Sequence, residues 1–265
     1  SRPSPRRCRS RRTGDSRAYR YMWNRERMSL MAMKRIVISL GGSVLVPSLE
    51  KNHIREYTTV LRRLGKEHRI FVVVGGGGEA RRYIGAARAL GIDEATGDEL
   101  GIQVTRMNAL LLAGTLGEAA YPNIAESYRD AARFGESGKI VVMGGVIPGQ
   151  TTDAVAALLA EKVRADLIIN WTSVDGIYSA DPKKHRDAVR HSTLTPAGLQ
   201  AIIRGDRLEA GSNTVFDTLA AKIIARSGIP LVVLDGRKPG DPRKAIRARK
   251  GTLVTEGKAW KDIAF

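Results

Sequence analysis

Short apolar segments alternate with helical patterns along most of the chain, and this alternation is the strongest constraint on its fold. Strands are predicted where β-branched and other apolar residues cluster, over residues 34–40, 70–74, 140–143, 166–170 and 231–234. Helices are predicted around Ile54, Tyr57, Leu61 and Leu64 and over residues 79–90, 100–118, 153–164 and 214–227. In the helix at 100–118, the expected apolar contacts are Ile102, Met107, Leu110 and Leu111. Uniformly apolar strands separated by helices are typical of a parallel sheet covered on both faces. We therefore predict an α/β fold, a three-layer αβα sandwich with a mostly parallel central sheet.

Glycine-rich turns follow three of these predicted strands. They are Gly41-Gly42-Ser43, the four glycines Gly75 to Gly78, and the stretch from Gly144 to Asp153. A glycine has no Cβ, so its backbone amide can approach an anion closely, and a helix that begins just beyond adds the positive end of its dipole. Parallel strands end at one edge of a sheet, so the three turns could hold several phosphates in one crevice. Taken singly, each could be an ordinary tight turn, and Thr152 or Asp153 could simply be a helix N-cap.

Other well-known sites are not supported. The P-loop pattern is absent, and the loose dinucleotide pattern Gly75-x-Gly77-x-x-Ala80 lacks its acidic partner at the end of a following strand, because Asp98 precedes a helix. The one cysteine, Cys8, excludes a disulfide scaffold. The four histidines show no metal-ligand spacing, and we predict no metal site built from protein side chains.

The net charge of +17 is unevenly distributed. Residues 1–32 carry ten arginines and two acids, a net charge of +8, which leaves +9 for the remainder. We predict that residues 1–32 are a disordered basic extension, most simply upstream translated sequence before a start at Met28, Met31 or Met33, and that residues 33–265 form the folded domain. An RNA-binding arm is the alternative, but its aromatic residues are few. An anionic substrate is sufficient explanation for the remaining charge, so a nucleic-acid partner is not expected.

No apolar run is long enough to span a membrane, and residues 1–32 lack the apolar stretch of a secretory signal. The expected location is therefore the cytoplasm.

From Lys34 to near the C-terminus the sequence resembles the amino-acid kinase family, and within it the archaeal-type UMP kinases. Six motifs in order carry the resemblance: Gly-Gly-Ser-Val-Leu at 41–45, Val-Val-Gly-Gly-Gly at 73–77 with Arg81, Asp98 with Gly-Ile-Gln-Val-Thr-Arg at 101–106, Gly-Gly-Val-Ile-Pro-Gly-Gln-Thr-Thr-Asp-Ala at 144–154, Thr-Ser-Val-Asp-Gly-Ile-Tyr-Ser-Ala-Asp-Pro at 172–182, and Ala-Ala-Lys-Ile-Ile-Ala at 220–225.

The resemblance implies transfer of the γ-phosphoryl group of ATP to UMP, with Mg²⁺ as the counterion of ATP. It implies that Gly41, Gly42 and Ser43 bind the ATP phosphates and that Thr172, Tyr178 and Asp181 bind the adenosine. Gly77 would lie at the junction of UMP and ATP, and Arg81 would lie around the UMP and also contact ATP. It implies that UMP is bound by Gly76, Asp98, Val146, Ile147, Pro148, Gly149, Gln150, Thr151 and Thr152. It also implies a homohexamer built from dimers, and feedback inhibition by UTP.

One departure concerns the cation that faces the transferred phosphate. Many members of the family have a lysine two residues before the first glycine pair, and this chain has Ser39 there, as archaeal UMP kinases can. The resemblance makes Lys222 the candidate, with Arg81 and the backbone amides as the alternative. The attacking atom would be a phosphate oxygen of UMP, which is already ionised at neutral pH and needs no general base. Catalysis would therefore depend on alignment of the two nucleotides and neutralisation of charge on the transferred group.

Two alternatives stay open at this stage. Within the same fold, the acceptor could be acetylglutamate, carbamate or isopentenyl phosphate, although the segment at 146–152 has neither a carboxylate-binding arginine nor a histidine. From another class, the chain could be a non-catalytic nucleotide-binding storage or regulatory protein.

Overall fold

The structure is a computed structural model that describes residues 33–180, 182, 184–206, 216–263 and 265. Residues 1–32, with the extension predicted there, lie outside the described residues. Lys34–Phe265 forms one compact unit.

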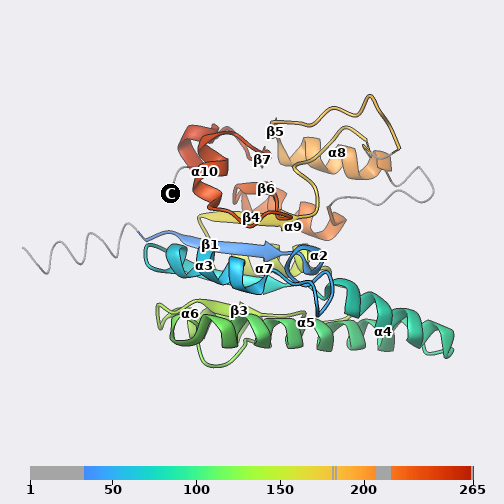
Figure 1. The fold of residues 1–265 in the computed structure, drawn as a ribbon. Helices are drawn as coiled ribbons and strands as arrows, with labels where there is room; N and C mark the ends of the chain where they lie inside the picture. The colour runs from blue at the N-terminus through green and yellow to red at the C-terminus, as the bar shows by residue number, and fades with distance from the viewer. Residues whose placement is uncertain (1–32, 181, 183, 207–215, 264) are drawn as a thin grey trace, which may run out of the picture. The chain divides into compact units, whose positions relative to one another are not determined.

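A seven-stranded sheet forms the centre of the described part of the chain (Figure 1). Its strands are β1 (Arg35–Leu40), β2 (Arg69–Val74), β3 (Val141–Met143), β4 (Leu167–Thr172), β5 (Thr193–Leu194), β6 (Leu231–Asp235) and β7 (Thr252–Val254), in the order β3-β2-β1-β4-β6-β7-β5. All neighbouring strands are parallel except β6 and β7, which are antiparallel. The mostly parallel sheet is confirmed, and the five predicted strands correspond to β1, β2, β3, β4 and β6, whereas β5 and β7 were not predicted.

Helices cover both faces of this sheet. They are α2 (Gly42–Leu45), α3 (Ile54–Gly65), α4 (Gly77–Ala89), α5 (Glu94–Leu116), α6 (Tyr128–Gly135), α7 (Thr152–Val163), α8 (Pro196–Asp206), α9 (Thr218–Ser227) and α10 (Pro242–Arg247), with short 3₁₀ turns at Gly117–Ala119 and Trp260–Ile263. The sequence did not predict α2, α6, α8 or α10. The predicted helix at 214–227 begins only at Thr218, where Asp217 caps it.

Alternation along β1 divides the core into two layers. Ile36, Ile38 and Leu40 pack with α3, α5 and α10 on one face. Val37 packs on the other face, where α6, α7, α8 and α9 lie. Ser39 shares that second face, so a buried polar side chain lies under α7 where the strand ends. The strands carry their glycine turns to this same edge.

The predicted packing of α5 needs correction at three positions. Met107, Leu110 and Leu111 were expected to be apolar contacts, and they are exposed to 51%, 54% and 47%. The buried stripe of α5 is made by Val104, Ala109, Leu112 and Leu116. Because the helix is apolar on more than one face, periodicity alone did not distinguish the covered face from the open one.

A search of the described helices finds none that is long and apolar enough to cross a membrane.

Candidate functional site

The three glycine turns line one cavity of about 460 Å³ at the carboxyl edge of the sheet. We call it the edge cavity. Two of the turns touch through their backbones, because a Cβ built on Gly42 would lie 2.0 Å from the nitrogen of Gly77. A Cβ on Gly75 would lie 3.1 Å from Oγ1 of Thr152, which belongs to the third turn. In Figure 1, α2 accordingly lies beside the start of α4 at the end of β1. Only glycine fits at this junction, and its backbone amides stay close to the cavity.

Two polar side chains of α5 fix these turns. Asn108 is buried, and its Nδ2 donates hydrogen bonds to the carbonyl oxygens of Gly75 and Gly76 at 3.0 and 3.1 Å. The Thr105 hydroxyl donates to the carbonyl of Ile102 and accepts from the backbone nitrogen of Gly145, both at 2.6 Å. Sequence reasoning missed both residues. The available signal was a polar residue, Asn108, directly beside the apolar stripe of a helix.

The predicted UMP ligands line the edge cavity, with one exception. Gly76, Asp98, Ile147, Pro148, Gly149, Gln150, Thr151 and Thr152 line it; Val146 does not, and is packed against the core instead. Asp98 accepts a hydrogen bond from the backbone nitrogen of Gly149 at 2.8 Å, which ties α5 to the third turn. Tyr128 donates from its hydroxyl to Oε1 of Gln150 at 2.9 Å, so the amide group of Gln150 has a fixed orientation. Burial raises the pKa of Tyr128 to about 12, so it remains a donor at neutral pH.

The predicted phosphate ligands, apart from Gly41, line the same cavity. Gly42, Ser43 and Gly77 line the cavity with Arg81, while Gly41 is set back and donates from its nitrogen to the carbonyl of Trp171 at 3.0 Å. Arg81 is exposed and has no ion pair among the described residues. Its guanidinium is therefore available for an anion.

The start of α7 differs in one detail from the prediction. The N-cap is Thr151, whose hydroxyl accepts from the nitrogen of Ala154 at 3.1 Å; it is neither Thr152 nor Asp153. The same hydroxyl donates to Oδ2 of Asp217 at 2.9 Å, which joins α7 to the start of α9.

A carboxyl group lies beneath this helix start. Oδ1 of Asp153 accepts from the Ser39 hydroxyl at 2.8 Å and from Nδ2 of Asn170 at 3.1 Å. Burial raises the pKa of Asp153 to about 6, the bonds from Ser39 and Asn170 lower it, and the charge of Asp217 raises it further. Asp153 remains partly exposed, so its carboxyl group is desolvated only in part. Ser39 thus occupies the position of the expected lysine with a neutral hydroxyl that is bonded to a carboxyl group.

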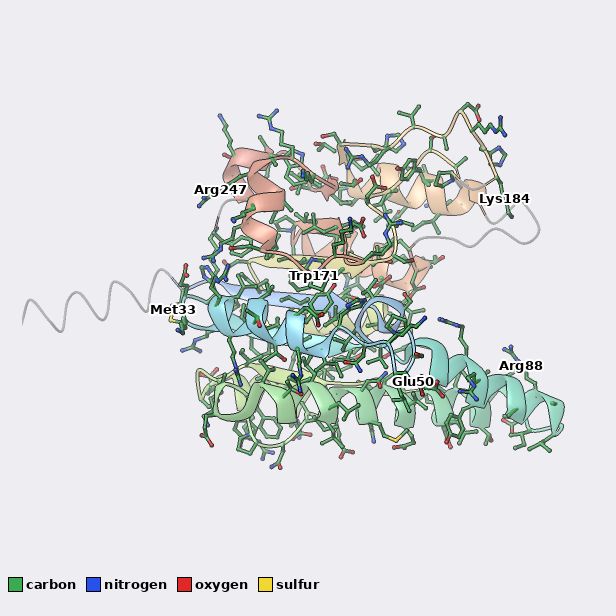
Figure 2. All side chains as sticks on the ribbon, in the orientation of Figure 1. Met33, Glu50, Arg88, Trp171, Lys184 and Arg247 are labelled. Atoms are coloured by element: carbon green, nitrogen blue, oxygen red, sulfur yellow. The ribbon has the colours of Figure 1, made fainter. Side chains whose placement is uncertain are left out.

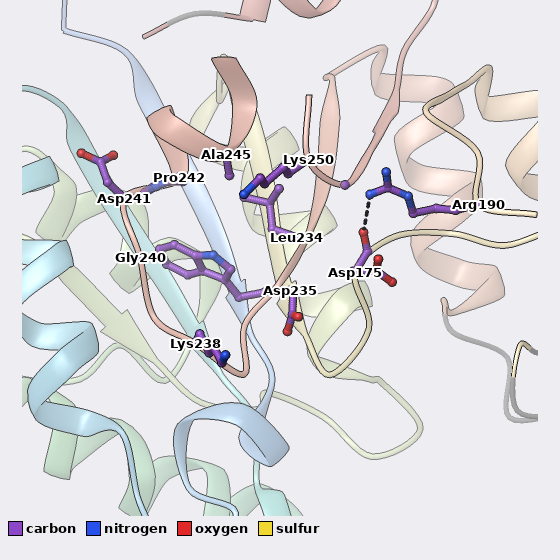
Figure 3. A pocket seen from close by; sticks show the side chains of 12 residues that line it. Asp175, Arg190, Leu234, Asp235, Lys238, Gly240, Asp241, Pro242, Ala245 and Lys250 are labelled. Carbon is purple, nitrogen blue, oxygen red and sulfur yellow. Dashed lines mark hydrogen bonds between the residues drawn. The ribbon is translucent and has the colours of Figure 1, made fainter. Parts of the chain in front are cut away.

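Two of the three predicted adenosine ligands, Thr172 and Tyr178, lie beside a second cavity of about 290 Å³ (Figure 3). Thr172 ends β4 directly after Trp171, which lines this cavity (Figure 2). Tyr178 donates from its hydroxyl to Asp175 at 2.8 Å, and Asp175 is another lining residue. This bond raises the pKa of Tyr178. Neither Thr172 nor Tyr178 itself lines the cavity, and Asp181 lies outside the described residues.

Lys222 does not reach either cavity. Its neighbours Ala220, Ala221, Ile223 and Ile224 form the buried face of α9, and Lys222 lies on the exposed side. It is absent from the lining of both cavities at this edge. The exposed position of Lys222 favours Arg81 as the cation near the phosphates, and the role of Lys222 stays a prediction.

Comparison with known proteins gives a consistent result. The family model described as "Amino acid kinase family" matches residues 34–235. The chain belongs to this family. The kinase is 65% identical to a uridylate kinase of Methanoculleus marisnigri over 84% of this chain and 97% of that protein, and 58% identical to one of Methanoregula boonei over 83% and 94%. Among solved structures, a uridylate kinase from Archaeoglobus fulgidus aligns with a TM-score of 0.73 at 43% identity, over 84% of this kinase and all of that chain.

Proposed function

We infer that this protein is a UMP kinase, which transfers the γ-phosphoryl group of ATP to UMP and so takes part in pyrimidine nucleotide synthesis. The observation that carries the proposal is the edge cavity, where three glycine turns from adjacent parallel strands meet. Such a cavity suits the triphosphate of one nucleotide and the single phosphate of another, placed end to end. The 65% identity to a uridylate kinase supports UMP as the acceptor.

In the proposed complex, the ATP phosphates lie against Gly41, Gly42, Ser43 and Gly77, and the adenosine lies toward Thr172, Tyr178 and Asp181. UMP lies against Gly76, Asp98 and the turn at 146–152. One carboxylate oxygen of Asp98 accepts the hydrogen bond from Gly149, and the other oxygen can accept one from a ribose hydroxyl. Arg81 is suited to a phosphate, because a planar guanidinium can bind two oxygens at once.

The reaction forms one bond and breaks one. An ionised phosphate oxygen of UMP attacks the γ-phosphorus of ATP, the bond between that phosphorus and the β,γ-bridging oxygen breaks, and UDP and ADP result. No side chain needs to accept a proton. The chain contributes alignment by the glycine amides and charge neutralisation by Arg81.

Magnesium belongs to this proposal as the counterion of ATP. The described residues contain no group of three or more histidine, cysteine, aspartate or glutamate side chains that could hold a metal ion. This fits an ion held mainly by nucleotide phosphates and water, as magnesium often is at kinase sites. When bound, it would neutralise charge on the phosphate chain.

The acceptor can be tested directly. Formation of ADP is measured with ATP and magnesium in the presence of UMP, CMP or acetylglutamate. We expect ADP formation to be fastest with UMP. Formation with acetylglutamate alone would replace the acceptor but keep the kinase, and no ADP with any acceptor would favour a non-catalytic nucleotide-binding protein.

The role of Arg81 can be tested by substitution, with the neighbouring Arg82 as the matched control. Arg81→Gln should lower turnover by about tenfold or more, because it removes a cation from the phosphates. Arg82→Gln should have little effect, since Arg82 pairs with Glu79 at 3.2 Å on the surface and such pairs contribute little to stability. Lys222→Ala separates the two candidate cations. Near-normal turnover of Arg81→Gln together with a large loss in Lys222→Ala would reverse the assignment made here.

We also propose that the kinase self-associates, as the hexamer implied by the resemblance requires. Exposed Tyr83 on α4 and Met107, Leu110 and Leu111 on α5 line a groove of about 750 Å³ together with Leu49. An apolar surface of this kind favours a second copy of the chain. Light scattering should give a mass well above that of one chain, and Leu110→Glu should reduce it. A wild-type monomer would contradict this part of the proposal.

The proposed kinase unit is residues 33–265, located in the cytoplasm, with residues 1–32 dispensable for catalysis.

A further inference from the structure

A cavity at the opposite edge of the sheet concentrates positive charge. Its volume is about 210 Å³, and four of its lining residues are cationic: Arg35, Arg69, Lys162 and Arg164. Glu136 is the only acid among the lining residues. We call it the cationic cavity. Its charge is not explained by the proposed reaction, which takes place at the other end of the strands.

Two of these cations are direct neighbours on adjacent strands. Arg35 begins β1 and Arg69 begins β2, and the parallel register pairs them with each other. Adjacent strands lie about 4.8 Å apart, and like charges at opposing positions destabilise a sheet. Arg35 lies two residues before Val37, and Arg69 lies two residues before Phe71. Val37 and Phe71 pack on the face that α7 covers, so the side chains of both arginines lie on that face too. A ligand of opposite charge would relieve their repulsion.

The other two cations come from the end of α7. Lys162 lies in its last turn, and Arg164 is its C-cap with φ 53° and ψ 57°. This left-handed conformation usually belongs to glycine or asparagine, and it costs conformational free energy at an arginine. The helix dipole stabilises a cation at a carboxyl terminus, which accounts for one charge at this position. It does not account for the two arginines that the strands add.

Few anions within the chain balance these charges. Nη1 of Arg69 lies 3.6 Å from Oε2 of Glu136, whose side chain is 75% exposed. Asp166 accepts a hydrogen bond from the backbone nitrogen of Arg35 at 2.8 Å, and its carboxylate offsets part of the positive charge without lining the cavity. Within the described part of the chain, the side chains of Arg35, Lys162 and Arg164 form no ion pair. With Glu136 opposing Arg69, the lining residues retain a net charge of +3.

We propose that the cationic cavity binds the di- or triphosphate group of a small ligand, at a site separate from the edge cavity. Guanidinium groups bind phosphate oxygens in pairs, and three arginines together with a lysine suit a chain of phosphates better than a single carboxylate. The cavity is small, which favours the phosphate chain over a whole nucleotide.

The two cavities lie at opposite ends of the same elements. β1, β2 and α7 all run between them, and the 12 residues of α7 span about 18 Å. A phosphate chain cannot occupy both at once. Binding here therefore adds a site to the two nucleotide positions of the proposed kinase, and the inference does not depend on which acceptor the edge cavity takes.

The test is calorimetric titration of the full chain with inorganic pyrophosphate. UMP and a non-hydrolysable ATP analogue are present at saturation, so that they occupy the edge cavity. The decisive variant is Lys162→Gln/Arg164→Asn, which removes two cations and places asparagine at the left-handed position. The matched control is Arg247→Gln/Arg249→Asn, which removes the same charge. Arg249 also has a positive φ, of 52°, and neither arginine lines the cationic cavity.

We expect the wild-type and control proteins to bind pyrophosphate with affinities within about twofold of each other, and the Lys162→Gln/Arg164→Asn protein to bind at least about tenfold more weakly. Increasing salt should weaken the wild-type binding. The proposal is overturned if wild type shows no binding heat at millimolar pyrophosphate, or if the control loses as much affinity as the decisive variant. If the double variant does not fold, as judged by its thermal transition, Arg35→Gln takes its place and should show the same selective loss.

The source of the phosphates is decided by a second pair of titrations. Tripolyphosphate and CTP differ by the nucleoside alone. Equal affinities would assign the site to the phosphate chain, and tighter binding of CTP would assign it to a nucleotide. Failure of the UMP kinase assay would leave both titrations interpretable, because the variants compare the same cavity in each.

Discussion

Asp153 should make the kinase less stable as the pH rises, and Asp153→Asn should remove this dependence. Its carboxyl group has an ordinary pKa of 3.8 and a pKa of about 6 in the folded chain, mainly because of burial. Folding therefore favours the protonated form. The stabilisation is fully present below pH 3.8 and is lost as the pH rises through about 6.

The magnitude follows from the same two values. One pKa unit corresponds to about 1.4 kcal/mol, so a shift from 3.8 to about 6 corresponds to about 3 kcal/mol. Asp153 keeps some exposed surface, and solvent there reduces the effect to between about 1 and 3 kcal/mol. Asparagine cannot ionise, and its Oδ1 can still accept from Ser39 and Asn170. The variant should accordingly match wild type only below the ordinary pKa, at about pH 3, and be more stable than wild type by about 1 to 3 kcal/mol at pH 8.

The measurement is urea unfolding of both proteins across this pH range, followed by the fluorescence of the buried Trp171 and Trp260. The difference between the two proteins cancels the titration of all other groups. Ser39→Ala should steepen the wild-type dependence, because the hydrogen bond from Ser39 lowers the pKa of Asp153. Ser39→Ala should have no such effect in the Asp153→Asn background.

Asp93→Asn is a control of opposite sign. Asp93 caps α5, and hydrogen bonds from Thr96 lower its pKa. Its contribution is present above pH 3.8 and lost as the pH falls through the lowered pKa, so Asp93→Asn should be less stable than wild type at neutral pH and approach it in acid. A stability difference between Asp153→Asn and wild type that is flat with pH, or that is larger at pH 5 than at pH 8, would refute the reasoning about Asp153.

Three further predictions concern activity. Gly42→Ala should lower turnover by at least about tenfold, because its Cβ would lie 2.0 Å from the backbone nitrogen of Gly77 and separate the two turns. Gly85→Ala is the control: its Cβ meets nothing within 4 Å, so steady-state kinetics should be unchanged. Tyr128→Phe should raise KM for UMP by about 2- to 10-fold with turnover little changed, since it removes one hydrogen bond to Gln150; an unchanged KM would show that this bond does not position the base. Deletion of residues 1–32 should leave turnover and thermal stability intact, and loss of activity in a folded truncated chain would show that the segment is required.

The fold was largely predictable because its strongest signals are local. An apolar strand such as Arg69–Val74 is recognisable without knowing its neighbours, and its glycines mark where it ends. β5 and β7 were missed because they have two and three residues, and pairing rather than composition creates them. The open face of α5 was missed because Met107 and Leu110 have the composition of a core.

The site was predictable only where glycine carries it. The turns at Gly42, Gly75 and Gly145 follow strands, and parallel strands must end together, so their convergence required no knowledge of side chains. Asn108 and Thr105 were not predicted, because a polar residue in a helix can equally face solvent. Their role depends on which carbonyl or amide lies opposite, and only the packed structure determines that.

The group formed by Ser39, Asp153 and Asn170 lies beyond any local pattern. The register pairs Ser39 of β1 with Asn170 of β4, and α7 brings Asp153 above both. Sequence separation hides the group, since Ser39 and Asp153 are 114 positions apart in the chain. Ser39 alone looked like the loss of a charge, and its actual partner is an acid whose pKa is raised. A lysine at this position would form an ion pair with Asp153, whereas serine leaves the carboxyl group partly protonated near neutral pH. In the proposed reaction, the absence of this lysine leaves Arg81 and the glycine amides to neutralise the charge of the phosphates.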